Sequence, residues 1–145
     1  MDSTVTERDA PDTSALDERA ISRGHITMRP ETARAIAGNE IAKGDVLAAA
    51  RFAAVQAAKE APSFLPLIDS ATVEQLAVDF DVREGLIEVT ATVTCSVGQS
   101  ARLRALSAAT AATLTIYDMC KSADRTMQIG PVNLLDPPGA IAELH

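Results

Sequence analysis

The chain has 145 residues, a formal charge of −7, 47% hydrophobic residues and only 3% aromatic residues. This length suits one domain with a single core, which must be built mainly from Ala, Val, Leu and Ile. The acidic balance argues against nucleic-acid binding, which needs a basic face, and no apolar run approaches the ~20 residues that span a bilayer.

The first fifteen residues are rich in Ser, Thr, Asp and Pro, and they lack both a basic start and an apolar run. Such a segment is typical of a disordered tail rather than of a signal peptide. We therefore expect a cytoplasmic protein in which residues 16–135 form one domain. A disordered tail is predicted over residues 1–15 and an irregular tail over residues 136–145.

The first half of the domain is predicted to form a strand and two helices. Residues 20–28 mix apolar and polar positions and favour a strand. Pro30 is suited to open a short helix, which Gly38 ends. Asp45 is suited to cap the Ala-rich helix that follows, and Pro62 ends that helix.

Two amphipathic segments come next. Residues 76–82 and residues 86–97 both alternate apolar and polar side chains, as half-buried strands do. The short turn between them contains Gly85, so the pair is predicted to form an antiparallel hairpin. The apolar face of this hairpin needs a cover, and the Ala-rich helices are available for it.

An Ala-rich helix is predicted over residues 102–121, and a last strand over residues 127–135. Large apolar residues recur in the helix at spacings of three and four, while its other faces carry small residues. A helix that is apolar or small on nearly every side is expected to be central and buried. The small faces have two open interpretations, packing in the core or packing against another subunit.

The helix closes in a polar cluster. Asp118 and Lys121 lie at positions i and i+3 of its last turn, so the simplest interpretation is an ion pair at the helix end. The two cysteines, Cys95 and Cys120, are not spaced as metal ligands and are expected to be small buried hydrophobes. No metal site and no cofactor is predicted. The order of elements predicts an α+β sandwich, with a mostly antiparallel sheet and Ala-rich helices on one face.

The segment TLTIYDMCKSADRTMQIGPVNLL (113–135) resembles the molybdenum-cofactor C protein family, the cyclic pyranopterin monophosphate synthases. HITMRPET (25–32), KGDVLAAARFAAVQAAK (43–59) and LPL (65–67) match the same family in the same order. The resemblance covers Ala20 to Leu135. It implies a ferredoxin-like fold and a homo-oligomer, between a dimer and a hexamer built as a trimer of dimers.

The resemblance also implies a site. The family converts a cyclised dihydro-GTP into cyclic pyranopterin monophosphate with loss of pyrophosphate, which requires cations and acid/base groups. The resemblance implies that Lys43 of KGDV contacts the phosphate groups or the ring of the substrate. Asp118 and Lys121 of YDMCK supply an acid/base group and a cation. The alternative interpretation makes Lys43 an exposed loop residue.

Several site positions depart from the family pattern. The segment PLIDS has Asp69 where the family has His, which removes a hydrogen-bond donor and a group that titrates near neutrality. The segment ARLRAL has Arg102 and Arg104 where the family has two Glu, and the Lys- and Gly-rich tail of the family is missing. We expect Asp69 to belong to the catalytic set and to pair with one of the arginines, which would bind an anionic or carbonyl-bearing substrate.

One helix over 102–121 would place Arg104 and Asp118 roughly 21 Å apart, at about 1.5 Å per residue. A small ligand in one subunit would not touch both, so a site that uses both must combine two chains.

Three functions follow from the resemblance and the departures. The first is an enzyme repurposed to another cyclisation or rearrangement, for example in specialised metabolism. The second is an inactive oligomeric paralogue with a regulatory or scaffolding role, and the third is a still-active cyclic pyranopterin monophosphate synthase. The expected partners are a small anionic or nucleotide-like substrate and further copies of the chain, with no nucleic acid and no membrane.

Overall fold

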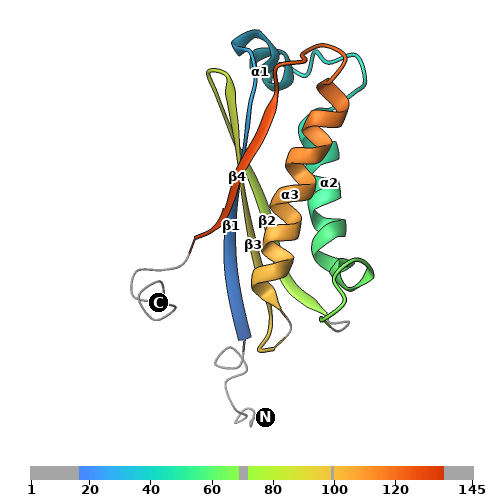
Figure 1. The fold of residues 1–145 in the computed structure, drawn as a ribbon, viewed down its shortest axis with the longest axis vertical. Coiled ribbons are helices and arrows are strands. Elements are labelled where there is room, and N and C mark those ends of the chain that lie inside the picture. The colour runs from blue at the N-terminus through green and yellow to red at the C-terminus, as the bar shows by residue number, and fades with distance from the viewer. Residues whose placement is uncertain (1–16, 69–71, 99, 136–145) are drawn as a thin grey trace, which may run out of the picture.

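The computed structural model describes residues 17–68, 72–98 and 100–135. Within them the chain forms four strands and three α-helices, with one 3-10 turn after the second helix (Figure 1). The predicted order of elements is confirmed. In chain order they are β1 (Asp17–Thr27), α1 (Pro30–Ala37), α2 (Val46–Lys59), the 3-10 turn (Ala61–Ser63), β2 (Val73–Arg83), β3 (Leu86–Ser96), α3 (Ala101–Cys120) and β4 (Gln128–Leu134).

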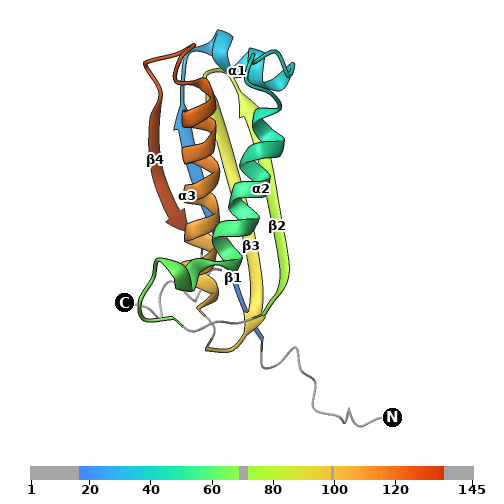
Figure 2. The ribbon, with the colours of Figure 1, turned by 90° about the vertical axis from the view of Figure 1, so that its right-hand side faces the viewer.

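The four strands form one sheet in the order β2-β3-β1-β4, and all neighbours are antiparallel. The connection from β1 to β2 crosses through α2, and the connection from β3 to β4 crosses through α3. Both helices therefore lie on the same face of the sheet, side by side (Figures 1 and 2). This is the ferredoxin-like arrangement of two split βαβ units, and the predicted fold class is confirmed.

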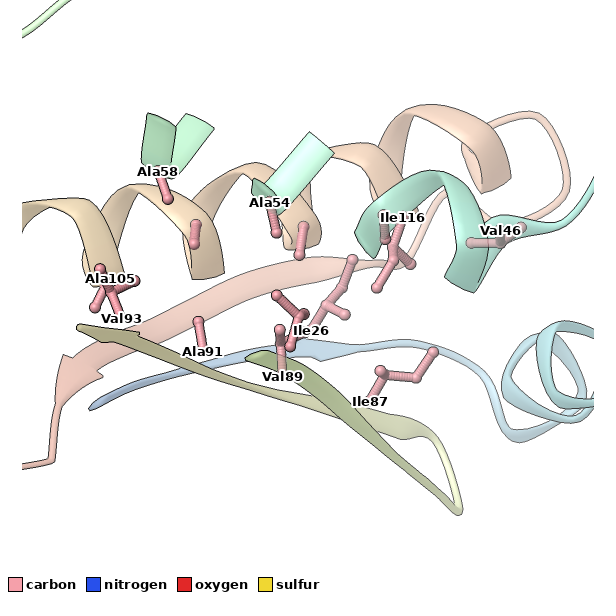
Figure 3. Close-up of a cluster of buried hydrophobic side chains, with 14 of the residues drawn as sticks. Ile26, Val46, Ala54, Ala58, Ile87, Val89, Ala91, Val93, Ala105 and Ile116 are labelled. Atoms are coloured by element: carbon pink, nitrogen blue, oxygen red, sulfur yellow. The ribbon is translucent and has the colours of Figure 1, made fainter. Parts of the chain in front are cut away.

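The core lies between this helix layer and the sheet (Figure 3). Alternate residues of β3 point into it, so the predicted strand pattern is confirmed. The buried residues of β3 are Ile87, Val89, Ala91, Val93 and Cys95, and α3 meets them with Ala101, Ala105, Ala108, Ala112 and Ile116. Cys95 and Cys120 are both buried and free, as expected.

Small residues let α3 approach β1 very closely. A Cβ on Gly24 of β1 would lie 3.3 Å from Thr113 Cγ2 and 3.4 Å from the Cβ of Ala109. In the same contact, Ser22 Oγ donates a hydrogen bond to the carbonyl oxygen of Ala105 at 2.6 Å. The small residues on this side of α3 therefore pack in the core. Ser107 and Ala111 instead line a surface groove, so for them packing against another subunit stays an open alternative.

The expectation that α3 is buried on nearly every side is wrong for the described residues. Leu103, Leu114 and Tyr117 are 41%, 55% and 39% exposed. Alanines fill most of the space against the sheet, and these three larger side chains point away from it. The outer side of α3 is consequently an apolar surface.

The hairpin between β2 and β3 is attached to the end of β1. Gly85 lies in its turn with a φ of +69°, a conformation that residues with a Cβ rarely adopt. The amide of Met28 donates to the carbonyl oxygen of Gly85 at 2.9 Å, and a Cβ on Gly85 would lie 2.9 Å from the Met28 carbonyl oxygen. This contact leaves room only for glycine.

Candidate functional site

Three of the predicted site residues gather where α3 ends, at the upper end of the molecule in Figure 1. Lys43 comes from the loop between α1 and α2, while Asp118 and Lys121 come from the last turn of α3 and the residue after it. Lys121 Nζ donates a hydrogen bond to Asp118 Oδ1 at 2.6 Å, and both side chains are exposed. The predicted ion pair is therefore confirmed. Lys43 lies close enough for its charge to help lower the pKa of Asp118.

The charges of this group favour its ionised forms. The hydrogen bond and charge of Lys121, with a smaller contribution from Lys43, hold the pKa of Asp118 below its usual value. The hydrogen bond and charge of Asp118 in turn raise the pKa of Lys121. At neutral pH the site therefore presents a carboxylate that accepts hydrogen bonds beside ammonium groups that donate them.

Two adjacent cavities border these residues. One, of about 450 Å³, is lined by Tyr117, Lys121, Ser122 and Arg125. The other, of about 280 Å³, is mainly apolar and is lined by Ala35, Glu40, Ile41, Ala42, Lys43, Met119, Ser122 and Ala123. Since Ser122 lines both, the two cavities adjoin each other, and one contains cationic side chains while the other is mainly apolar.

A buried aspartate supports the loop beneath the first cavity. Asp124 is 1% exposed and accepts hydrogen bonds from the amide of Arg29 at 2.9 Å and from Thr32 Oγ1 at 2.8 Å. It also accepts from the amide of Thr126 at 2.8 Å and from Thr126 Oγ1 at 2.6 Å. Burial acts to raise the pKa of Asp124, but the hydrogen bonds from Thr126, Arg29 and Thr32 outweigh it and hold this pKa far below the usual range. The loop after α3 is thereby tied to the start of α1.

Asp124 and Arg125 are not among the site residues predicted from the sequence. A signal was present, because an Asp followed two residues later by Thr is typical of a turn in which the carboxylate accepts from the backbone. That signal does not reveal the two distant donors, Arg29 and Thr32, which make the aspartate a link between two elements.

Arg104 lies far from this group, in the interior. It is fully buried, and its NH1 donates to the carbonyl oxygens of Ala58 at 2.7 Å and of Lys59 at 3.3 Å. These are carbonyls at the C-terminal end of α2, which have no partner within their own helix. The described contacts give Arg104 a structural role as a cap, and a substrate contact of Arg104 stays a prediction.

The other predicted site residues lie apart from the group or outside the described residues. Arg102 is half-buried in the first turn of α3. Because α3 is one helix from Ala101 to Cys120, the predicted separation of roughly 21 Å between Arg104 and Asp118 applies. Asp69 lies outside the described residues, so its predicted pairing with an arginine stays a prediction.

A second surface feature lies on the outer side of α3. A groove of about 380 Å³ runs between this helix and the segment after α2, and its lining is almost entirely apolar. It is lined by Ala57, Phe64, Leu65, Leu103, Leu106, Ser107, Thr110, Ala111 and Leu114.

Among the helices that the structure describes, none is both long enough and apolar enough to cross a membrane. In the described ranges, no three His, Cys, Asp or Glu side chains are grouped so that they could hold a metal ion.

Curated relatives match most of the chain. A cyclic pyranopterin monophosphate synthase from Roseiflexus sp. (strain RS-1) is 42% identical over 133 residues, covering 88% of this chain and 84% of that protein. A synthase of the same name from Chloroflexus aurantiacus is 38% identical over 133 residues, covering 90% of this chain and 82% of that protein. A molybdenum cofactor biosynthesis bifunctional protein from Chlorobaculum tepidum is 37% identical over 130 residues, which are 88% of this chain and 42% of that protein.

Among solved structures, a de novo designed protein with a ferredoxin fold matches with a TM-score of 0.45 and 14% identity, covering 84% of this chain and 88% of that one. The model of the MoaC family matches residues 8–139. The chain belongs to the MoaC family.

Proposed function

We propose that this chain catalyses the reaction after which its relatives are named, the formation of cyclic pyranopterin monophosphate in molybdenum cofactor biosynthesis. The observation that carries the proposal is the meeting of Lys43, Asp118 and Lys121 at one end of α3, beside a cationic and an apolar cavity. The identity of about 40% over most of the chain supports it.

Each of the three residues has a role in this proposal. Lys43 and Lys121 hold the phosphate groups of the nucleotide substrate and stabilise charge that develops on it. Asp118 transfers a proton in the ring rearrangement. In the free protein, Lys121 holds the pKa of Asp118 low. A phosphate that draws Lys121 away would raise this pKa and make the carboxylate a stronger base.

The proposal includes a second copy of the chain on the apolar groove of α3. Leu103 and Leu114 are exposed there, at the two ends of a groove that a single chain leaves uncovered. Two α3 helices that pack antiparallel about a two-fold axis would bring the first turn of one helix beside the last turn of the other. Arg102 of the partner subunit would then approach Asp118 and Lys121. Within a single chain, Arg102 lies about one helix length away from these two residues.

A second candidate is a related cyclisation or rearrangement of another small anionic substrate. The observation that favours it is the position of Arg104, which replaces an acid of the family pattern and is engaged with the carbonyls of α2. An oligomer without catalytic activity is the remaining alternative.

The test is turnover of cyclised dihydro-GTP by the purified full chain, with the Roseiflexus relative as the positive control. Pyrophosphate release and the pterin product are measured for the unchanged protein and for Asp118→Asn and Asp79→Asn. Asp79 is an exposed aspartate of β2, away from α3. We expect turnover by the unchanged protein and by Asp79→Asn, and none by Asp118→Asn. An inactive chain beside an active relative would refute the proposal, and turnover of another substrate would then support the second candidate.

A further inference from the structure

Arg125 is a cation that the roles above do not use. Its side chain is exposed and lines the cavity of about 450 Å³ together with Lys121, Ser122 and Tyr117. Within the described ranges, no group forms a hydrogen bond or an ion pair with its guanidinium. The cavity thus contains two cationic groups and two hydroxyl groups in a chain whose formal charge is −7.

The backbone under Arg125 is held in place on both sides. On one side, Asp124 is fixed by the amide of Arg29 and the hydroxyl of Thr32, and on the other side Thr126 binds the same carboxylate through its amide and hydroxyl. The residue before Asp124 is held too, because Arg29 NH2 donates to the carbonyl oxygen of Ala123 at 2.6 Å. A cation on a backbone that is already ordered loses less entropy when it binds a ligand.

The two cations have complementary donors. A guanidinium offers a planar fork of N–H groups that matches two oxygens of a phosphate. An ammonium has three donors, of which Asp118 takes one from Lys121, so two remain for a ligand. The hydroxyl groups of Ser122 and Tyr117 can donate to the remaining oxygens of the same anion.

We propose that Arg125 and Lys121 form a subsite for a phosphate or diphosphate group, in which Arg125 binds two oxygens of the anion. The inference deepens the proposed function, on which it rests for the identity of the substrate, and it makes Arg125 the residue that selects phosphorylated ligands. Lys121 and Arg125 both lie between α3 and β4 and line the same cavity.

The experiment measures the binding of inorganic pyrophosphate to the full chain by titration calorimetry at low ionic strength, where charge interactions are least screened. Four proteins are compared: the unchanged chain, Arg125→Ala, Arg125→Lys and Arg19→Ala. Arg19 is an exposed arginine of β1 that lines a different cavity, with Asp17, Glu74, Gln75 and Thr94. Its replacement removes the same charge from the chain without touching the subsite.

We expect Arg125→Ala to weaken pyrophosphate binding at least about tenfold, as the loss of a charge-assisted hydrogen-bond pair does. Arg125→Lys should give an intermediate affinity, since it keeps the charge and loses the fork, and Arg19→Ala should leave the affinity unchanged. Equal weakening by Arg125→Ala and Arg19→Ala would overturn the subsite, because the effect would be one of net charge. Absence of pyrophosphate binding to the unchanged chain would overturn it as well.

Turnover and pyrophosphate binding separate this inference from the proposed function. Arg125-dependent binding in a chain that fails to convert cyclised dihydro-GTP would refute the function and keep the subsite. Turnover that survives in Arg125→Ala with an unchanged KM, beside unchanged pyrophosphate binding, would refute the subsite and keep the function.

Discussion

Arg104 of α3 donates a hydrogen bond to the carbonyl oxygen of Ala58 at 2.7 Å, so a guanidinium in the core holds the end of the neighbouring helix. The carbonyl oxygen of Lys59 shares the same donor at 3.3 Å. Carbonyls in the last turn of a helix need such partners when water does not reach them. The contact fixes α2 against α3 at the end of the molecule opposite to the candidate site.

We predict that Arg104→Met destabilises the protein by about 2–4 kcal/mol, because methionine fills similar space but leaves buried carbonyls without a donor. Urea unfolding followed by circular dichroism measures the change. Arg102→Met, at a half-buried position two residues earlier, is the control and should cost less. Equal stability of the Arg104 variant and the unchanged chain would contradict the capping role.

The sequence predicts the elements well because their periods are distinct. The alternation in residues 76–82 and 86–97 identifies the hairpin, and the caps at Asp45 and Gly38 identify helix ends, all within a few residues of the observed bounds. The face of α3 that enters the core is harder to predict, because both of its sides are apolar. The alanine-rich side faces the core because β1 approaches the helix closely at Gly24, where larger side chains do not fit.

The site is predictable only in part, for a similar reason. The motifs identify Lys43, Asp118 and Lys121, and the structure brings these three together. The burial of Arg104 depends on the position of the end of α2, which is a tertiary contact that no local pattern encodes. The links of Asp124 to α1 have the same origin, since they join residues more than ninety positions apart.

Asp124→Asn should destabilise the protein by about 2–4 kcal/mol at pH 7, because an amide cannot accept all four hydrogen bonds of the carboxylate. The effect should depend on pH. The pKa of Asp124 is lowered in the folded state, so its contribution is complete above the pKa of an unfolded Asp, about 3.9, and is lost as pH falls toward the folded value.

The measurement is urea unfolding of both proteins at pH 7, 5 and 3.5. The difference in the free energy of unfolding should be the same at pH 7 and 5 and smaller at pH 3.5. A difference that does not change with pH would mean that the ionised form of Asp124 is not what stabilises the loop.

Gly24→Ala tests the close contact between β1 and α3. The added methyl group would lie 3.3 Å from Thr113 Cγ2 and 3.4 Å from the Cβ of Ala109, so the helix must shift slightly to admit it. We expect a loss of about 1–3 kcal/mol, as for other overpacked cores. Thermal unfolding measures it, and the combined variant Gly24→Ala with Thr113→Ser should recover part of the loss by removing the nearer methyl group.

Leu114→Glu tests the second copy on the groove. A charge buried in an apolar contact between subunits is costly, so the variant should dissociate into monomers at concentrations where the unchanged chain is oligomeric. Light scattering coupled to size-exclusion chromatography measures the mass. Val97→Glu, at an exposed apolar residue outside the groove, is the control and should leave the oligomer intact. A monomeric unchanged chain would remove this part of the proposal.

Asp118 and Asp124 lie six residues apart, and their replacement by asparagine should have opposite consequences. The pair of Asp118 with Lys121 is exposed, so Asp118→Asn should leave the melting temperature nearly unchanged while activity is lost. Asp124→Asn should lower the melting temperature, whereas at a temperature where the variant stays folded it should retain part of the activity. Differential scanning calorimetry and the turnover assay, run on the same preparations, give both values. If Asp118→Asn lost stability and kept its activity, the pair would be a structural feature of the helix end, and the acid/base role would have to be assigned to another group of the site.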